Sequence, residues 1–289
     1  MNIKQITAAI LTTAILAGEA VVPYSPALSF ENMTAGAVGL LGHDWCGEKA
    51  EYLFTTDGCL YISGTGDMYD YESSSKTPWF PDNLVYHGTV KYIQFEGDIT
   101  RIGNYAFSDC FDLSKIELPE SVTSIGSHAF HNCTSLTSLT IPEKVSHIGA
   151  YAFKDCDGME DITVLDPYCK IEYTPNEGDL PQKTTVHGYT GSTAEKWAEE
   201  TGLRFESLGK IPAPVYGDAN LDGSVTVADA VTILQFIGNK DKYVLSERAK
   251  INADCYNPGD GITGSDAVLI QKVDSGLVSP DLLPILPTE

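Results

Sequence analysis

The chain has 289 residues, of which 43% are hydrophobic and 20% are charged. This length allows one large domain or two modest ones, each able to bury a core. Forty acidic and 18 basic side chains give a formal net charge of −22, which argues against binding to nucleic acid or to an anionic membrane surface, because both need clustered cations. The apolar content is too high for a disordered acidic tail, so the composition predicts an acidic globular protein.

Residues 1–20 have the pattern of a secretory signal peptide. Lys4 supplies a positive charge, an apolar run extends from Ile6 to Ala17, and Gly18 and Ala20 occupy the −3 and −1 positions of a cleavage site. The apolar run is too short to span a membrane, and no later stretch approaches the roughly 18 apolar residues that a transmembrane helix needs. We therefore expect a secreted protein without a transmembrane segment.

A repeat of 23 residues occupies residues 90–165. In each of three successive units, five apolar positions are followed by Gly, Ala, Phe and Cys, and a partial fourth unit holds Met159, Ile162 and Val164. The positions in the third unit are Leu136, Leu139, Ile141, Val145, Ile148, Gly149, Ala152, Phe153 and Cys156. Self-similarity at a fixed period is the sequence signature of a solenoid, in which each unit hides its apolar side against its neighbours.

The pattern within one unit predicts its local structure. Residues 136–141 read as a short strand with one face inward, ended by Pro142, and Gly149 is expected to permit a backbone turn that a Cβ would obstruct. Cys110, Cys133 and Cys156 are expected to form a buried column of reduced thiols, because cysteines at this interval lack the paired spacing of zinc ligands. The chain has seven cysteines, an odd number, and Cys46 and Cys59 are left as a pair that could bridge.

The repeat pattern I-G-x-x-A-F-x-x-C-x-x-L-x-x-I-x-I-P resembles the BspA-type leucine-rich repeats of bacterial surface and secreted proteins. The resemblance implies protein binding or adhesion, with no particular ligand, and it implies caps on both sides of the repeats. Residues 21–89 are interpreted as the N-terminal cap, with two strands joined at Asp57-Gly58. Residues 166–210 are interpreted as the C-terminal cap, with a strand at 185–189 and a helix capped by Ser192.

Aromatic side chains are dense between residues 45 and 86. They could form a glycan or peptide site, or the core of the N-terminal cap, and we favour the cap core. The outward positions of the repeat strands are poor in aromatics, so this face does not favour stacking on sugars. These outward columns are Tyr92, Lys115, Ser138 and Asp161, and Gln94, Glu117, Thr140 and Thr163.

A calcium loop follows the short proline-containing linker at residues 211–216. Positions 1, 3, 5, 7, 9 and 12 of such a loop converge on one point and supply the oxygens that Ca²⁺ requires. Here these positions are Asp218, Asn220, Asp222, the carbonyl of Ser224, Thr226 through water, and Asp229. Gly223 allows the sharp turn at position 6. The prolines of 211–217 exclude an entering helix, whereas residues 227–237 favour a helix after the loop, so the pattern is half an EF-hand.

A second loop and helix recur 37 residues later. The second loop spans 13 residues, from Asp254 to Asp266, where the first spans 12. The inserted residue leaves the middle ligands open among Tyr256, Asn257 and Asp260, and we choose Asn257 and Asp260. The backbone carbonyl comes from Gly261 or Ile262, of which Ile262 is chosen. The sequence thus predicts two Ca²⁺ ions.

The duplicated loop–helix unit of residues 217–289 resembles a type I dockerin module. Dockerins anchor proteins of plant-fibre-degrading anaerobes to cohesin modules of scaffoldins, the scaffold proteins of the cellulosome. The resemblance implies that cohesin contacts come from the helices after each loop. Mapped by position, the contact residues are Val227, Ala228, Leu234 and Gln235 in the first unit, and Gly264, Ser265, Gln271 and Lys272 in the second.

The expected protein is therefore multidomain. A leucine-rich repeat solenoid of short strands (α+β) precedes a small all-α calcium-binding module. We expect a secreted, non-catalytic cellulosomal component, since the chain carries no H-E-x-x-H, G-x-S-x-G or P-loop motif and the histidines His128 and His131 occupy variable surface positions of the repeat. The alternatives are a polysaccharide-acting enzyme with an unrecognised site in the N-terminal region, and a surface adhesin.

Overall fold

The computed structural model describes residues 40–80, 90–173 and 180–286. The predicted signal peptide and its cleavage site lie outside the described residues, as does Tyr86 of the aromatic-rich segment. Within the described ranges, no helix combines the length and the hydropathy that crossing a membrane would require.

The first part of the described chain is an antiparallel hairpin that leads into the solenoid. Its elements are β1 (Leu40–Trp45), β2 (Ala50–Thr55), β3 (Cys59–Asp67) and the 3-10 turn η2 (Ser74–Lys76). β2 and β3 pair antiparallel across the Asp57-Gly58 turn, as the sequence predicts. β3 then pairs in parallel with β4, so the cap continues the stack of the repeats.

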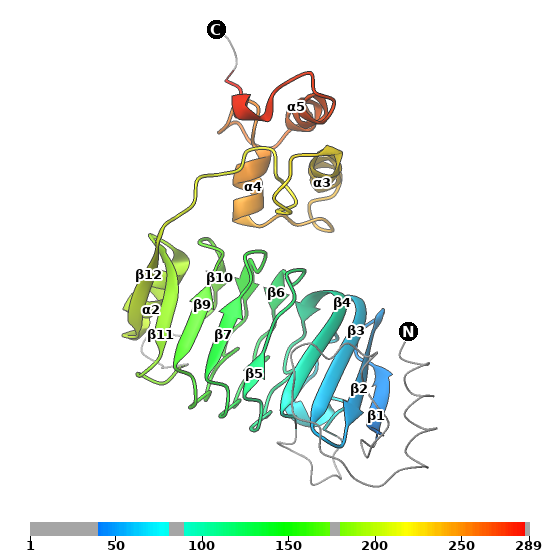
Figure 1. The fold of residues 1–289 in the computed structure, drawn as a ribbon, viewed down its shortest axis with the longest axis vertical. Helices are drawn as coiled ribbons and strands as arrows, with labels where there is room; N and C mark the ends of the chain where they lie inside the picture. Colours follow the sequence, from blue (N-terminus) through cyan, green and yellow to red (C-terminus); the bar gives the residue numbers. More distant parts are fainter. Residues whose placement is uncertain (1–39, 81–89, 174–179, 287–289) are drawn as a thin grey trace.

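The solenoid consists of short parallel strands that stack along its axis (Figure 1). They are β4 (Tyr92–Ile102), β5 (Lys115–Ile116), β6 (Ser124–Ile125), β7 (Ser138–Ile141), β8 (His147–Ile148), β9 (Asp161–Val164) and β10 (Lys170–Ile171). One edge carries the ladder β4–β6–β8–β10, and the other carries β7–β9–β11–β12. The pairs Tyr92 with Lys115, Ser124 with His147 and Ser138 with Asp161 join residues one repeat apart, so the 23-residue period is the register of the stack.

Aromatic rings and thiols run through the core in two columns. The rings of Phe107 and Phe130 lie 5.4 Å apart and those of Phe130 and Phe153 lie 5.8 Å apart. The thiols of Cys133 and Cys156 donate to the carbonyl oxygens of Phe107 and Phe130, at 3.2 and 3.1 Å.

The thiols are free and buried, as expected for the repeat cysteines. Burial raises the pKa of the Cys110 thiol well above its usual value and therefore keeps it protonated. Cys46 and Cys59, left open by the sequence, are also free and buried.

The repeat glycines have a different role from the one expected. None of Gly103, Gly126 and Gly149 adopts a positive φ; the left-handed turn positions are held by Tyr105, His128 and Tyr151, among others. A Cβ on Gly149 would lie 2.6 Å from the backbone nitrogen of Ser127, and one on Gly126 would lie 2.6 Å from that of Asn104. The glycines therefore allow neighbouring coils to approach, and any larger residue would push the stack apart.

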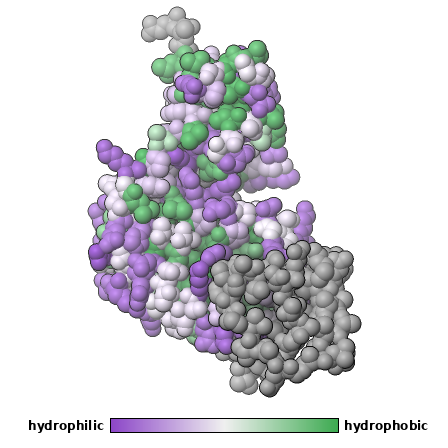
Figure 2. Space-filling view, viewed as in Figure 1, coloured by the Kyte–Doolittle hydropathy of each residue, from purple (hydrophilic) through white to green (hydrophobic). Residues whose placement is uncertain are grey.

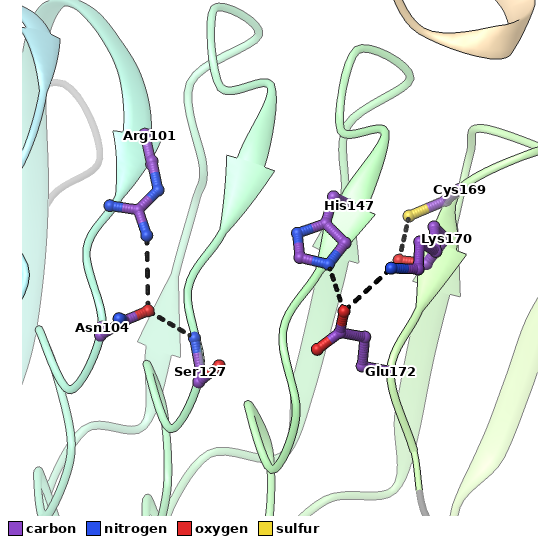
Figure 3. A network of polar contacts seen from close by, with 7 residues as sticks. All are labelled: Arg101, Asn104, Ser127, His147, Cys169, Lys170 and Glu172. Atoms are coloured by element: carbon purple, nitrogen blue, oxygen red, sulfur yellow. Dashed lines mark hydrogen bonds and ion pairs between the residues drawn. The ribbon is translucent and has the colours of Figure 1, made fainter.

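Polar side chains also join the units along the β4–β10 edge (Figure 3). Asn104 Oδ1 accepts from the backbone nitrogen of Ser127 at 2.8 Å. Further along, Glu172 Oε1 lies 3.1 Å from His147 Nε2 and accepts from Lys170 Nζ at 3.0 Å. The hydrogen bond from His147, followed by that from Lys170, lowers the pKa of Glu172. These contacts are exposed or only part-buried, and they supplement the core rather than replace it.

The C-terminal end of the solenoid is closed by β11 (Thr185–Thr190), α2 (Thr193–Thr201) and β12 (Arg204–Lys210). Ser192 caps α2 by accepting from the backbone nitrogen of Glu195, and Glu195 reaches back to Gly191, so the predicted cap is confirmed. Trp197 is buried against the last coil. The aromatic-rich N-terminal segment similarly buries Trp79 and Phe80, which favours its interpretation as a cap core.

A second, separate hydrophobic cluster forms after the linker. Its helices are α3 (Val227–Gly238), α4 (Glu247–Ala253) and α5 (Gly264–Asp274), followed by the 3-10 turn η3 (Pro280–Leu282). α3 and α5 pack against each other through Ala230, Ile233, Ala267 and Ile270. This part lies beyond the β10 edge of the solenoid, with α4 nearest to it (Figure 1).

The stacked core predicts a large cost for removing one ring. Phe130→Ala is expected to lower the free energy of unfolding of the solenoid by about 3–5 kcal/mol, because the side chain is fully buried between two other rings. Tryptophan fluorescence in denaturant measures this, since Trp45, Trp79 and Trp197 all lie in the solenoid and its caps. Trp45→Ala, at a site that is 54% exposed, is the control; equal losses for the two variants would contradict the packing.

Asp166 predicts a pH dependence of stability. The side chain is fully buried and one carboxylate oxygen, Oδ2, lacks a hydrogen-bond partner. Burial raises its pKa from 3.8 to about 6. The folded chain therefore binds this proton more tightly than the unfolded chain, and stability falls as the pH rises from about 4 to about 6.

Asp166→Asn is expected to stabilise the solenoid at pH 7.5 by at most about 3 kcal/mol, the equivalent of the full shift, and to flatten its pH profile below pH 6. The same fluorescence measurement at several pH values tests this. Asp112→Asn, at an exposed site, is the control. A profile in which the Asp166 variant keeps the slope of the unmodified chain would show that another group is responsible.

Candidate metal centre

The two loops of the C-terminal module precede α3 and α5, and each helix begins with a capping box. Thr226 and Thr263 are the N-caps, and Asp229 and Asp266 close the capping boxes three residues later. Both aspartates are fully buried. The last residue of each loop therefore also starts a helix, which fixes its carboxylate relative to the helix axis.

In the first loop, the carboxylate of Asp218 accepts from the backbone. Its Oδ1 accepts from the nitrogen of Asp222 at 3.1 Å and its Oδ2 accepts from the nitrogen of Gly223 at 3.2 Å. Gly223 has φ +84°, which lets the chain turn sharply around this carboxylate. The turn at Gly223 that the sequence predicts is therefore confirmed.

The other end of the first loop is tied to its beginning. Asp229 Oδ1 accepts from the nitrogen of Asn220 at 3.0 Å and its Oδ2 accepts from the nitrogen of Thr226 at 2.9 Å. Asn220 and Asp222 also contact each other, since Asn220 Nδ2 donates to Asp222 Oδ2 at 2.8 Å. The Ser224 side chain is exposed, and its backbone nitrogen donates to Asp222 Oδ1 at 2.9 Å.

The carboxylates of this loop act on one another. Burial raises the pKa of Asp218, and the charges of Asp229 and Asp222 raise it further, against the backbone amides that lower it. Burial likewise raises the pKa of Asp229, and the charge of Asp222 adds to this. Ionised together, the three side chains repel each other in a partly desolvated place, so the loop favours a cation among them.

In the second loop, one carboxylate oxygen has no partner. Asp254 Oδ2 accepts from the nitrogen of Gly259 at 2.7 Å, whereas its Oδ1 is buried without a hydrogen bond. Asp266 Oδ1 accepts from the nitrogens of Cys255 and Tyr256, at 2.9 and 2.8 Å. A buried carboxylate oxygen without a partner is costly, and this one lies at the position that Asp218 occupies in the first loop.

The backbone shows where the inserted residue lies. Asp254 bonds to the amide five residues later, as Asp218 does, and Asn257 shares with Leu221 the fourth loop position and a φ of +57°. Tyr256 and Pro258 thus stand where Asn220 and Asp222 stand, and the extra residue falls between Gly259 and Ile262.

The side chain of Asn257 donates to Asp260 Oδ2 at 2.6 Å, so the two chosen middle ligands lie together. Asn257 nevertheless occupies the place of Leu221, which is not among the predicted ligands of the first loop. Ile262, chosen for its carbonyl, is half-buried against the core of the module. The second loop therefore offers fewer oxygens at the positions that carry them in the first.

The oxygen donors of the loops suit a hard cation, but their carboxylates alone do not make up a full set of ligands. Across residues 40–80, 90–173 and 180–286, no three His, Cys, Asp or Glu side chains are gathered closely enough to hold a metal ion by themselves. An ion in the first loop would have to draw on the amide oxygen of Asn220 and the carbonyl of Ser224 as well as on Asp218, Asp222 and Asp229. Oxygen donors of this mixed kind fit Ca²⁺.

α4, which the sequence analysis missed, holds the first loop in place. Asn252 Oδ1 accepts from the nitrogen of Val215 at 3.2 Å, and its Nδ2 donates to the carbonyl of Asp218 at 3.0 Å. Arg248, which is buried, donates to the carbonyls of Pro212 and Ala213 at 2.8 and 2.9 Å. The linker is thus bound to α4. The available signal was Ser246, which caps α4 by accepting from Ala249 at 3.1 Å.

The segment after α5 contacts the second loop and the residue that precedes the first loop. Ile285 accepts from the nitrogen of Asn257 at 2.8 Å and donates to the carbonyl of Cys255 at 3.0 Å. Leu283 packs beside Gly217, where an added Cβ would lie 3.0 Å from it. Leu283 and Ile285 pack against the same hydrophobic cluster as Val225 and Ile262 of the two loops.

The residues expected to contact a partner are all exposed in the module. Val227 and Leu234 expose 50% and 48% of their surface, and Val231, which the sequence analysis did not select, exposes 47% between them. These three side chains form an apolar stripe on α3. The corresponding positions of α5 are Gly264, Val268 and Gln271, so only Val268, 49% exposed, is a large apolar side chain there.

Comparison with known proteins identifies the repeats. The BspA type Leucine rich repeat region matches residues 80–174 in six copies, where the 23-residue spacing gave three whole units and part of a fourth. The chain therefore contains a BspA-type leucine-rich repeat domain. The matched range extends to residue 174 and so includes β10, which continues the parallel stack after β8.

A curated relative shares a short segment with the chain. It is a xylanase/beta-glucanase of Ruminococcus flavefaciens, 43% identical over 65 residues, which is 20% of this chain and 8% of that protein. The chain thus spans less than a tenth of the relative's length.

Two kinds of solved structure are similar. A leucine-rich repeat protein from Eubacterium ventriosum is 22% identical, covers 54% of this chain and 45% of its own, and has a TM-score of 0.43. A chain from the structure of the third ScaB cohesin of R. flavefaciens in complex with a group 1 dockerin is 35% identical to this chain. The match covers 23% of this chain and 95% of that chain, with a TM-score of 0.22.

Proposed function

We propose that residues 217–289 form a calcium-binding dockerin that attaches the chain to a cohesin module of a scaffoldin, and that the repeat domain is displayed as a protein-binding or adhesion module. The observation that carries the proposal is the first loop, where Asp218, Asp222 and Asp229 act on one another and share the backbone amides of one turn. When bound, Ca²⁺ supplies two positive charges among these carboxylates.

The first loop is the stronger of the two proposed sites. It offers Asn220 and Asp222 at positions where the second loop has Tyr256 and Pro258. The second loop still has the buried and unpartnered Oδ1 of Asp254, together with Asp260 and Asp266. We therefore propose two ions held with unequal affinity, the tighter one in the first loop, because affinity follows the number of charged ligands.

The exposed faces of α3 and α5 are proposed to contact the cohesin. The stripe of Val227, Val231 and Leu234 would be buried on docking, which accounts for large apolar side chains on the surface of a small acidic module. Gln235 and Lys272, among the other exposed residues, supply polar contacts around it.

The chain is proposed to be non-catalytic and exported. The 65 residues shared with the R. flavefaciens enzyme make up 8% of that protein, so the likeness is to a small part of it. The aromatic side chains Tyr52, Trp79 and Phe80 of the N-terminal segment are buried, which supports the proposal that this segment serves as a cap core. Adhesion is the second candidate, since proteins with BspA-type repeats are typically surface or secreted bacterial proteins.

Titration with calcium tests the loops. The full chain, freed of metal with EDTA and dialysed, is expected to bind two Ca²⁺ ions in isothermal titration calorimetry. Asp222→Ala should remove the tighter site, and Asp241→Ala, at an exposed position outside both loops, should leave both sites intact. At a hundredfold excess over its dissociation constant, one ion adds about 2.7 kcal/mol to the stability of the module.

Chelation should consequently reduce the helical circular dichroism while the tryptophan fluorescence of the solenoid stays unchanged. A chelated chain that takes up no Ca²⁺ would refute the calcium proposal.

Binding to a panel of immobilised cohesins, in the presence of Ca²⁺, tests the docking surface. Leu234→Glu is expected to weaken binding at least tenfold, because it places a charge in the middle of the apolar stripe. Gln271→Glu, at the corresponding position of α5, should have a smaller effect. Leu208→Glu, an equally exposed leucine on β12 (45% against 48%), is the matched control. Failure of every cohesin to bind, or equal weakening by the Leu208 variant, would count against this surface.

A further inference from the structure

β4 has an edge that is open in its middle. On one side it pairs with β3 along most of its length, from Tyr92 to Arg101. On the other side, among the residues that the structure describes, strand pairing occurs only at its two ends, with β5 at Tyr92 and Ile93 and with β6 at Arg101 and Ile102. The edge from Gln94 to Glu96 thus has no neighbouring strand there.

The next unit turns away at this point. β5 ends after Ile116, and the segment continues through Leu118 and Pro119 into a turn that the nitrogen of Val122 closes by donating to the carbonyl of Pro119 at 3.0 Å. In the following unit, β7 runs over four residues and pairs along its whole length with β9. The second unit is therefore the place where the ladder on this edge is interrupted.

A groove of about 390 Å³ lies between the two diverging segments. Residues 92–96 of β4 form one wall and residues 115–120 form the other. Phe95, which is half-buried, and the buried Leu118 supply apolar surface. A groove beside an open strand edge can receive an extended chain, because the backbone pairs with the strand and alternate side chains enter the groove.

The rim of the groove is acidic. Glu96, Glu117 and Glu120 lie along it, and the one lysine, Lys115, is 2.7 Å from Glu117. In the described part of the chain, neither Glu96 nor Glu120 forms a salt bridge. Both Glu96 and Glu120 are exposed, so a basic side chain that arrives from solvent can pair with either carboxylate.

We propose that this acidic groove binds an extended peptide segment of another protein that carries lysine or arginine, added as a strand along Gln94–Glu96 of β4. Pairing with the backbone supplies affinity that depends little on sequence, and Glu96 and Glu120 select for positive charge. The proposal deepens the protein-binding role proposed for the repeats. It does not involve the calcium loops, so the cohesin and calcium experiments succeed or fail independently of it.

The test uses the full chain and three fluorescein-labelled eight-residue peptides in which valine alternates with lysine, glutamate or serine. Fluorescence polarisation is expected to show binding of the lysine peptide and not of the glutamate peptide. Glu96→Gln/Glu120→Gln should weaken that binding at least tenfold. Glu160→Gln/Glu199→Gln removes the same two charges from exposed sites elsewhere on the solenoid and should change it less than threefold.

Hydrogen exchange then distinguishes strand addition from loose electrostatic attraction. Amides in residues 94–96 should become protected when the lysine peptide binds, while those of β9 should not change. The proposal is overturned if no peptide binds, if the charge-matched control weakens binding as much, or if 94–96 gain no protection. It is also overturned if sedimentation shows that the unmodified chain self-associates and the Glu96/Glu120 variant does not, because the occupant would then be a second copy.

Discussion

The solenoid depends on one constraint, the register of 23 residues at which each coil pairs with the next. Every strand pair between units joins residues one period apart, so a side chain always meets the same position of its neighbour. This is why the rings of Phe107, Phe130 and Phe153 can stack, and why the thiols of Cys133 and Cys156 can donate to carbonyls of the preceding coil. It also explains the repeat glycines, since the register places each of them against the backbone of the coil before it.

The repeat region and its caps could be predicted from the sequence because a period is visible without knowing any contact. The hairpin at Asp57-Gly58 and the helix capped by Ser192 were equally readable, since each rests on local chemistry. The sequence could not show why the repeats carry glycine, because a turn with positive φ and a close approach between two coils both favour this residue. Only the φ angles of Gly126 and Gly149 and the distance to the neighbouring coil separate the two explanations.

The candidate site, too, could be predicted from the sequence only in part. The twelve-residue spacing of the first loop predicts its ligand positions, whereas the longer second loop has no fixed spacing. The insertion is located by the φ that Leu221 and Asn257 share and by the bond from Asp254 to the amide five residues later. α4 was missed because it is seven residues long and its contacts are with the linker and the loop. Arg248 and Asn252 hold backbone groups of residues 212–218, and such long-range bonds leave no periodic signal.

The solenoid and the C-terminal module are stabilised by different interactions, so we expect different conditions to unfold them. The solenoid spreads its stability over many equivalent interfaces, so the loss of one contact is felt locally. The C-terminal module concentrates buried carboxylates in two short loops around a small core, so its stability depends on what neutralises them. A cation that orders the loops also fixes the first residues of α3 and α5, since Asp229 and Asp266 belong to loop and helix alike. The proposed attachment of the chain can therefore depend on calcium while the displayed repeats do not.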